Sequence, residues 1–571
     1  MKSNNRLAAL LLAASMMLNL SGCMSALALD DARGVHASTL STVVFDDITD
    51  GLQGQDDTGL DDDVAGEPSG EDGNASSEVT DPDGEAVPGD DVVPGDDIDG
   101  DGSSDDGLEM EIPDRTGDVP LGDIVDIVDG IMDEAMADGL LVDNGLEVQA
   151  ASIGYDVSFR NVVIGREGDV GEAFDFQAQC TGAGIVADTT SVTGNGYGTF
   201  SLTFASAGSY TVNITCATES GNGYVRDERT LEVNLSVTES NGTYRVTETS
   251  QSFKLNGTAT GTQDAFVIRC NEGFQWSEST KQQAQEIMDG MTLEEKVGQL
   301  FIAHYPGDGS GSNEQAAALV EAYHPGAFLV FAAMFNNRTP SDVIGKVNAA
   351  QAAAVADTGI PMFFSVDEEG GNVVRISDKA AYGHSKFPSQ LSMAGKGAAA
   401  IEADALDKAE FLQGLGMNVN HAPVADVSGA SGYMYKRERV YGGDPLMVAE
   451  YVAASVRGHN AVANIGTSIK HFPGYGSTSS DTHNGFAINN LSRGDFDYGD
   501  LLPFYAGIAA GSKSVMVTHN IIECMDTENP ASLSSAVVDV LRNDMNFDGV
   551  IMTDDLNMGA IIQAVALYYS L

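Results

Sequence analysis

Basic residues and cysteines are scarce in this sequence of 571 residues. It contains 28 Lys and Arg against 85 Asp and Glu, which gives a formal net charge of -57 at pH 7. A surplus of negative charge this large repels phosphate backbones, so it argues against nucleic acid as a partner. The five cysteines are too widely and irregularly spaced for a structural zinc site, and no HExxH pair is present. We therefore expect neither a metal nor a cofactor.

Long apolar runs are also scarce, because the only one is Leu7 to Leu20 near the N-terminus. Lys2 and Arg6 precede it, and Leu20-Ser21-Gly22-Cys23 ends it. This pattern resembles the signal peptide of a bacterial lipoprotein, residues 1–23, with Cys23 as the lipidated residue. A plain secretory signal is the alternative. No transmembrane helix is expected, and a lipid on Cys23 would hold the protein on a membrane at the cell surface or in the periplasm.

Two regions of different composition follow. Residues 24–150 are rich in Asp, Gly, Pro, Ser and Glu with scattered apolar residues, which predicts an acidic disordered linker. Residues 151–272 alternate apolar and polar side chains between turn signals, which predicts an all-β sandwich. The alternating stretch from Gly198 to Ile214 resembles the sandwich modules of surface adhesins, which implies an immunoglobulin-like or adhesin-like domain. Cys180 and Cys216 end two strand-like runs, so we predict a disulfide between them, with Cys270 as an alternative partner.

Apolar strand-sized runs alternate with helix-sized segments in residues 280–571, which predicts an α/β fold. Seven such units favour a (β/α)8 TIM-type barrel, with polar residues where the strands end. After the last strand, Gly559 to Leu571 holds only one helix-sized segment, so the eighth strand is missing. Either the barrel is C-terminally incomplete or another element closes it. The expected strands are Gly298 to Ala303, Gly326 to Phe331, Met362 to Val366, Val419 to Val424, Thr467 to His471, Ser514 to Val517 and Gly549 to Met552.

Acids and bases stand at two of these strand ends. Asp554 directly follows the last strand, and alternation directs it to the opposite face from Asp555. Asp481 and His483 lie two residues apart in a loop, where a turn brings the carboxylate to the imidazole and suits the histidine to proton transfer. Taken alone, Asp554 could merely cap the next helix and His483 could be an exposed loop residue.

Several motifs together resemble the β-N-acetylglucosaminidase branch of the family-three glycoside hydrolases. They are Val366-Asp367-Glu368-Glu369-Gly370-Gly371-Asn372-Val373-Val374-Arg375, Val419-Asn420-His421-Ala422-Pro423-Val424-Ala425-Asp426, Arg439-Val440-Tyr441-Gly442, Lys470-His471-Phe472-Pro473-Gly474-Tyr475-Gly476, Asp481-Thr482-His483 and Phe547 to Leu556. The match covers about residues 285 to 560. Tyr475 departs from it, because many members of the family have histidine there.

The resemblance implies a retaining mechanism and a role for each matching residue. Asp554 would be the nucleophile, and His483, supported by Asp481, would be the acid and base. The residues implied to bind the sugar in the innermost subsite are Asp367, Arg375, Arg439, Lys470 and His471, with His519 as a weaker candidate.

Three functions stay open. The first is an exo-β-N-acetylglucosaminidase acting on terminal β-linked N-acetylglucosamine of cell-wall or other glycans. The second is a β-glucosidase or β-glycoside phosphorylase of the same family, since a histidine tolerates an anionic phosphate acceptor better than a second carboxylate would. The third is an inactive surface binding or adhesion protein with a truncated barrel.

Overall fold

The computed structural model describes residues 41–45, 153–167, 175–187, 190–193, 195–218, 224–225, 227–261, 264–478 and 481–570. The predicted signal peptide with Cys23, and all of the predicted linker except residues 41–45, lie outside these residues. Among the described residues, no helix combines the length and the apolar character needed to cross a membrane.

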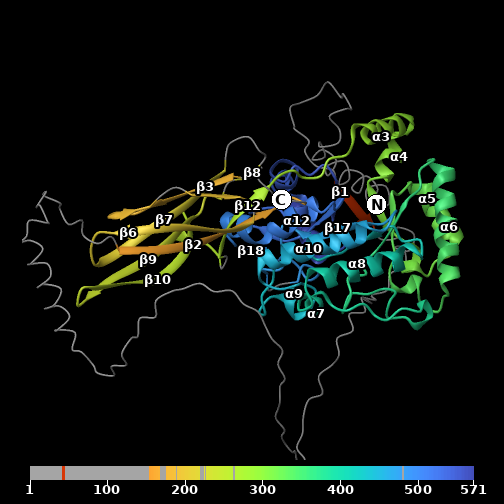
Figure 1. Cartoon of the computed structure of the whole chain (residues 1–571). Helices are drawn as coiled ribbons and strands as arrows, with labels where there is room; N and C mark the ends of the chain where they lie inside the picture. The colour runs from red at the N-terminus through yellow and green to blue at the C-terminus, as the bar shows by residue number, and fades with distance from the viewer. Residues whose placement is uncertain are drawn as a thin grey trace, which may run out of the picture. The chain divides into compact units, whose positions relative to one another are not determined.

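Two antiparallel-rich sheets form the predicted sandwich. One sheet has the order β11-β10-β9-β7-β3-β5 and the other the order β4-β6-β2-β12-β8 (Figure 1). Alternate residues of β2, β6, β7 and β9 are buried between the sheets, as the period-two pattern predicts. The strands are β2 (Ile153–Ile164), β3 (Asp175–Thr181), β4 (Ile185–Val186), β5 (Thr190–Thr193), β6 (Gly196–Phe204), β7 (Gly208–Thr218), β8 (Tyr224–Val225), β9 (Thr230–Ser240), β10 (Thr243–Leu255), β11 (Thr258–Ala259) and β12 (Ala265–Cys270).

The predicted bridge between Cys180 and Cys216 is wrong. In the pairing of β3 with β7, Cys216 lies opposite Ala178, and Cys180 lies opposite Ile214. The two cysteines are therefore diagonal neighbours, and no disulfide joins them. The alternative bridge through Cys270 is not formed either.

Seven parallel strands form the predicted α/β barrel. They are β13 (Phe301–His304), β14 (Ala327–Leu329), β15 (Phe363–Val366), β16 (Val419–Asn420), β17 (Gly466–Phe472), β19 (Ser514–Val517) and β21 (Val550–Thr553). All seven predicted apolar runs overlap these strands, and four of them contain the strand completely, those of β14, β15, β16 and β19. The first strand begins later than predicted, because Gly298 ends helix α4 (Leu293–Gly298).

Helices cover the outside of this sheet. Helix α8 packs on α10, α10 packs on α12, and α5 packs on α6 (Figure 1). Their starts are set by local signals: Asp444 accepts a hydrogen bond from the backbone N–H of Leu446 before Pro445 opens α10. The helices are α3 (Glu278–Gly290), α5 (Asn313–Tyr323), α6 (Pro340–Asp357), α7 (Gln390–Ala394), α8 (Ala398–Gln413), α9 (Tyr433–Lys436), α10 (Pro445–Asn460), α11 (Arg493–Asp495), α12 (Leu502–Ala509), α13 (Ser535–Asp539) and α14 (Gly559–Ser570).

An eighth strand closes the barrel from the N-terminal side. Strand β1 (Ser41–Phe45) pairs in parallel with β21, where Ser41 lies opposite Ile551, and with β13, where Val43 lies opposite Phe301. The predicted open edge is therefore covered by residues that we had assigned to the acidic linker. The place between β21 and β13 is filled by a segment about five hundred residues earlier in the chain than Asp554.

Candidate active site

Acids and bases gather where the barrel strands end. His304 ends β13, Asp367 follows β15, His421 follows β16, Lys470 and His471 belong to the end of β17, and Asp554 follows β21. Because the strands are parallel, all of these side chains belong to the same mouth of the barrel. A cavity of about 750 Å³ opens at the opposite end, where residues from the starts of the strands line it.

Two carboxylates and two cations form a buried ion-pair network at this mouth. The Lys470 ammonium lies 2.8 Å from Asp367 Oδ1 and 2.7 Å from Glu369 Oε1. The Arg439 guanidinium donates to the Glu369 carboxylate from Nε at 2.9 Å and from Nη2 at 2.8 Å. Arg375 lies 3.6 Å from the second oxygen of Asp367. The side chains of Lys470 and Glu369 are only 4% and 1% exposed, so these charges interact with little screening.

Burial and neighbouring charges set the protonation states in this network. Burial opposes ionisation of Asp367, but Lys470 and Arg375 outweigh it and hold the pKa of that carboxyl far below its usual range. The same balance, with Arg439 and Lys470 as the cations, lowers the pKa of Glu369 to about 2. Burial also opposes the charge on Lys470, yet Asp367 and Glu369 raise its pKa. At neutral pH the mouth therefore presents fixed, charged donors and acceptors, as a ligand with several hydroxyl groups requires.

The loop after β15 is held in shape by the carboxylate of Glu368. This side chain is fully buried and accepts hydrogen bonds from the backbone N–H groups of residues 375–377, at 2.8, 3.0 and 3.2 Å. The carboxylate thus binds the start and the end of the loop together. It fixes the positions of Asp367 and Arg375 without itself facing the mouth.

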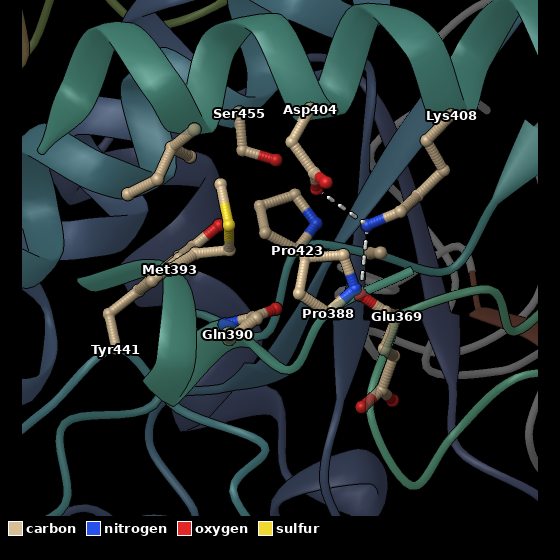
Figure 2. Close-up of a pocket in the computed structure, with 11 residues that line it drawn as sticks. Glu369, Pro388, Gln390, Met393, Asp404, Lys408, Pro423, Tyr441 and Ser455 are labelled. Carbon is tan, nitrogen blue, oxygen red and sulfur yellow. Dashed lines mark hydrogen bonds and ion pairs between the residues drawn. The ribbon is translucent and has the colours of Figure 1, made fainter. Parts of the chain in front are cut away.

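Lys408 of α8 supports the same loop from behind. Its ammonium donates to the backbone carbonyl of Glu369 at 2.9 Å and lies 3.3 Å from Asp404 Oδ2 (Figure 2). Figure 2 shows the Glu369 carboxylate directed away from Lys408. These residues line a cavity of about 10 Å³, which has room for one water molecule and none for a sugar. It is a packing gap behind the network.

A buried carboxylate orients His471. Asp426 Oδ2 lies 2.8 Å from His471 Nδ1, and Oδ1 accepts from the backbone N–H of Tyr475 at 2.7 Å. His471 Nε2 lies 3.4 Å from Nη2 of Arg439. Because a carboxylate only accepts and a guanidinium only donates, the proton of the ring lies on Nδ1 and Nε2 faces the mouth as an acceptor.

Asp554 extends the barrel sheet by one hydrogen bond beyond β21. Its backbone N–H donates to the carbonyl of Val517 at 3.0 Å, and its Oδ1 accepts from the backbone N–H of Asp555 at 2.9 Å. Burial raises the pKa of Asp554, but His471, His519 and the Asp555 N–H outweigh it, so the pKa is lowered. The carboxylate is therefore ionised at neutral pH, the state that a nucleophile requires.

Asp555 has different partners from Asp554, in line with the predicted alternation. Its carbonyl accepts from His519 Nε2 at 2.8 Å, and its carboxylate lies 3.7 Å from His304 Nε2. The Ser532 hydroxyl lies 2.7 Å from His519 Nδ1 and donates to it, because Nε2 carries the proton. Burial lowers the pKa of His519, so the ring is neutral and holds the backbone of the segment that carries Asp554.

Asp481 and His483 form the predicted pair. His483 Nδ1 lies 2.7 Å from Asp481 Oδ1, which also accepts from the backbone N–H of His483 at 3.0 Å. The Tyr433 hydroxyl donates to Asp481 Oδ2 at 2.9 Å. Burial raises the pKa of Asp481, but the hydrogen bonds from His483 and then from Tyr433 outweigh it and lower the pKa. The His483 side chain is 61% exposed, so its Nε2 edge is accessible to a ligand.

Two main-chain hydrogen bonds join this pair to the segment after Asp554. The N–H of Gly559 donates to the carbonyl of His483, and the N–H of Ala560 donates to that of Thr482, both at 3.1 Å. The first turn of α14 thus holds the loop. Among the residues that the structure describes, no hydrogen bond links the Asp481 and His483 side chains directly to Asp554.

The structure brings together all five predicted sugar-binding residues, and it adds partners that we did not predict. Glu369 connects Lys470 to Arg439, Asp426 orients His471, and Tyr433 binds Asp481. Glu369 and Asp426 both lie in motifs already noted, so the adjacent acids were a usable signal. For Tyr433 the sequence contains no such signal.

Known proteins share this region. Residues 292–568 match the family model described as "Glycosyl hydrolase family 3 N terminal domain". A "Beta-hexosaminidase" of Stenotrophomonas maltophilia (strain R551-3) is 34% identical over 223 residues, which are 38% of this chain and 64% of that protein. A "Beta-hexosaminidase" of Xylella fastidiosa (strain 9a5c) is 34% identical over 238 residues, which are 38% of this chain and 68% of that protein. The solved β-N-acetylhexosaminidase from Beutenbergia cavernae DSM 12333 is 30% identical, with 48% of this chain and 81% of that chain covered and a TM-score of 0.44. The chain therefore spans less than two thirds of the length of the Stenotrophomonas relative.

Proposed function

The chain belongs to glycosyl hydrolase family 3, and from this premise we propose that it is a retaining exo-β-N-acetylglucosaminidase, a β-N-acetylhexosaminidase. It would remove terminal β-linked N-acetylhexosamine from cell-wall or other glycans. The observation that carries the proposal is the contact of 2.7 Å between Asp481 and His483 in a loop held by the helix after Asp554. The name of the relatives, beta-hexosaminidase, supports the same substrate class.

The first half of the proposed reaction forms a glycosyl-enzyme. The ionised Asp554 carboxylate attacks the anomeric carbon as the bond to the leaving oxygen breaks. The protonated His483 gives the proton on Nε2 to that oxygen, while Asp481 stabilises the imidazolium through Nδ1.

The second half releases the sugar. His483, now neutral, takes a proton from a water molecule whose oxygen attacks the anomeric carbon, and Asp554 departs as a carboxylate. Two inversions at one carbon give net retention. The side chain of His483 is 61% exposed, which leaves access for this water.

We assign the innermost sugar subsite to Asp367, Arg375, Arg439, Lys470 and His471. The support is the network in which Glu369 joins Lys470 to Arg439 and Lys470 contacts Asp367, with distances of 2.7 to 2.9 Å. Arg375 lies 3.6 Å from Asp367, and His471 lies 3.4 Å from Arg439. Charge-assisted hydrogen bonds from such a network are short and directional, so they distinguish hydroxyl positions on a sugar ring.

The test is the hydrolysis of 4-nitrophenyl N-acetyl-β-glucosaminide by the full chain, with the anomer of the product followed by NMR. We expect the β-anomer first, and a slow fluorinated substrate should leave its sugar on the peptide that contains Asp554. An α-anomer as the first product would contradict retention. Turnover of a β-glucoside with no turnover of the acetamido sugar would instead identify a β-glucosidase.

A phosphorylase is the second candidate, because the acid and base is an imidazole and not a second carboxylate. A neutral imidazole does not repel an incoming phosphate dianion as a carboxylate would. Adding inorganic phosphate should then release N-acetylglucosamine 1-phosphate. If neither hydrolysis nor phosphorolysis occurs, the third function, an inactive surface binding or adhesion protein, takes the place of both.

We also propose that the protein is a lipoprotein anchored through Cys23 on the extracytoplasmic side of a membrane. The support is the sequence alone, with Leu7 to Leu20 followed by Cys23. Mass spectrometry of the N-terminal peptide from the expressing cell tests it. A diacylated Cys23 is expected, and an unmodified N-terminus at another residue would contradict the proposal.

A further inference from the structure

Tyr433 lies outside every motif that the family resemblance covers, yet it contacts the proposed acid and base. It is the first residue of α9 (Tyr433–Lys436), in the connection between β16 and α10. Its hydroxyl donates to Asp481 Oδ2 at 2.9 Å across 48 positions of sequence. The other oxygen of Asp481 binds His483. The Asp481 carboxylate is thus shared between the imidazole and a phenol from a different part of the barrel rim.

The hydrogen bonds inside the loop do not depend on Tyr433. Asp481 Oδ1 accepts from both the backbone N–H and the ring of His483, and the Asp481 carbonyl accepts from the N–H of Asn484 at 3.1 Å. A turn of this kind keeps the carboxylate beside the imidazole by itself. The phenol adds a different restraint, because it fixes the pair as a unit against the barrel.

A second tyrosine, Tyr475, restrains the same loop through a backbone group. The Tyr475 hydroxyl accepts from the backbone N–H of Thr482 at 3.1 Å, and its ring packs edge-on against Tyr433 with centroids 6.0 Å apart. Tyr475 occupies the position where many members of the family have histidine. The two phenols therefore offer a natural comparison between holding the loop and binding its carboxylate.

Three charged groups act on Tyr433. The guanidinium carbon of Arg437 lies 5.4 Å from the centre of its ring, the charge of Arg439 acts on it from the ion-pair network, and Asp481 faces its hydroxyl. Burial and then the hydrogen bond to Asp481 raise the pKa of Tyr433, so the phenol remains protonated and a donor throughout the neutral range.

We propose that Tyr433 is a positioning residue for the acid and base, holding the Asp481 and His483 pair at the barrel mouth and withdrawing negative charge from the carboxylate that faces the imidazole. The part of this inference that concerns proton transfer by His483 rests on the proposed function. The geometry predicts two separable effects of removing the hydroxyl. The loop loses a restraint, which slows proton transfer, and the carboxylate becomes more basic, which keeps the imidazole protonated to higher pH.

The experiment compares three variants of the full chain, Tyr433→Phe, Tyr475→Phe and Tyr435→Phe. Tyr435 is the matched control, because it belongs to the same helix and no hydrogen bond to its hydroxyl is found among the described residues. The values of kcat and KM for 4-nitrophenyl N-acetyl-β-glucosaminide are measured from pH 5 to pH 9. A hydrogen bond to a charged group is worth a factor of about ten or more, so kcat of Tyr433→Phe should fall about tenfold with little change in KM.

The pH profile distinguishes positioning of the carboxylate from simple loosening of the loop. In Tyr433→Phe the basic limb of the profile should move up by roughly half a pH unit, the scale of a weak electrostatic perturbation. Tyr475→Phe should lower kcat without moving the limb, and Tyr435→Phe should change neither. A limb that stays in place or moves down in Tyr433→Phe would overturn the inference, as would a loss no larger than that of Tyr435→Phe.

A second measurement decides the inference even if the chain proves to have no hydrolase activity. The pH titration of the His483 ring protons is followed by NMR in the parent chain and in Tyr433→Phe, with His483→Gln to identify the signal. A midpoint that rises in Tyr433→Phe supports the contact and its effect, and an unchanged midpoint refutes them. Failure of the parent chain to hydrolyse any glycoside refutes the proposed function alone.

Discussion

Replacing Glu369 with Gln removes one charge from the centre of the ion-pair network while keeping the shape of the side chain. The Gln side chain resembles the protonated form of the Glu369 carboxyl. The pKa shift of Glu369 therefore gives the stability that the variant should lose. A fall from 4.5 to about 2 corresponds to about 3 kcal/mol of stabilisation at 1.36 kcal/mol per unit. The side chain is 1% exposed, so solvent screening does not reduce this value much. Glu369→Gln should therefore lower the free energy of unfolding by about 3 kcal/mol at pH 7.

The assay is thermal and guanidinium unfolding of the full chain between pH 3 and pH 8. A loss of about 3 kcal/mol should lower the midpoint of the barrel transition by roughly 5 to 10 °C. The pKa is depressed in the folded state, so the contribution of Glu369 is complete above pH 4.5 and is lost as the pH falls toward 2. The difference between parent and variant should therefore be constant from pH 8 to about pH 5.5 and should shrink at lower pH.

Glu402→Gln is the control for this experiment. Glu402 accepts from Arg457 Nε at 3.1 Å, but its side chain is 44% exposed. Such a pair contributes only about 0 to 1 kcal/mol. Two results would refute the reasoning: a Glu369→Gln variant that is no less stable than Glu402→Gln, or a loss of stability in Glu369→Gln that does not shrink in acid. Either result would mean that the ionised Glu369 carboxylate does not stabilise the folded chain.

Three further changes test other parts of the site. Asp554→Ala should lower hydrolysis by roughly a thousandfold or more without unfolding the chain. Substantial turnover in Asp554→Ala, with the loss instead in Asp555→Ala, would show that the wrong carboxylate was assigned. His483→Ala should slow glycosides with poor leaving groups about a hundredfold more than activated aryl glycosides, and equal losses on both would argue against proton transfer. Burial and then the charge of Asp426 raise the pKa of Asp500 to about 8, so the parent chain should lose stability as the pH rises from about 4 to 8. Asp500→Asn should not show this loss in urea titrations, and parallel pH curves for the two chains would contradict the buried, protonated state.

The sequence predicted the elements whose signal is local. The apolar runs before Asp367, His471 and Asp554 are barrel strands, because a strand buried on both faces is apolar throughout. The alternating run from Gly198 is a strand of the sandwich, because a strand buried on one face alternates apolar and polar residues. The place of these residues at one mouth of the barrel could also be predicted, since parallel strands bring their carboxyl ends together. Their roles stay predictions that the family resemblance implies.

Features that depend on distant pairing escaped prediction. The run Ser41 to Phe45 reads as a few apolar residues before an acidic stretch, and nothing in it indicates that β13 and β21 are its partners. The register that separates Cys180 from Cys216 depends on where β3 and β7 meet, which spacing alone does not give. Tyr433 escaped for the same reason, because its partner is 48 residues away.

The first turn of α14 is hydrogen-bonded to the loop of His483. The position of His483 relative to Asp554 therefore depends on the number of residues between Asp554 and Gly559. Surface loops usually tolerate insertions, since lengthening a flexible connection costs little entropy. Here each added residue would extend the chain by about 3.3 to 3.6 Å and move His483, the proposed acid, away from Asp554, the proposed nucleophile. A displacement of about 1 Å can already cost a hundredfold in rate. Functional variants of this chain should therefore accept substitutions between Asp554 and Gly559 but neither insertions nor deletions, so that length, more than residue identity, is what selection preserves in this segment.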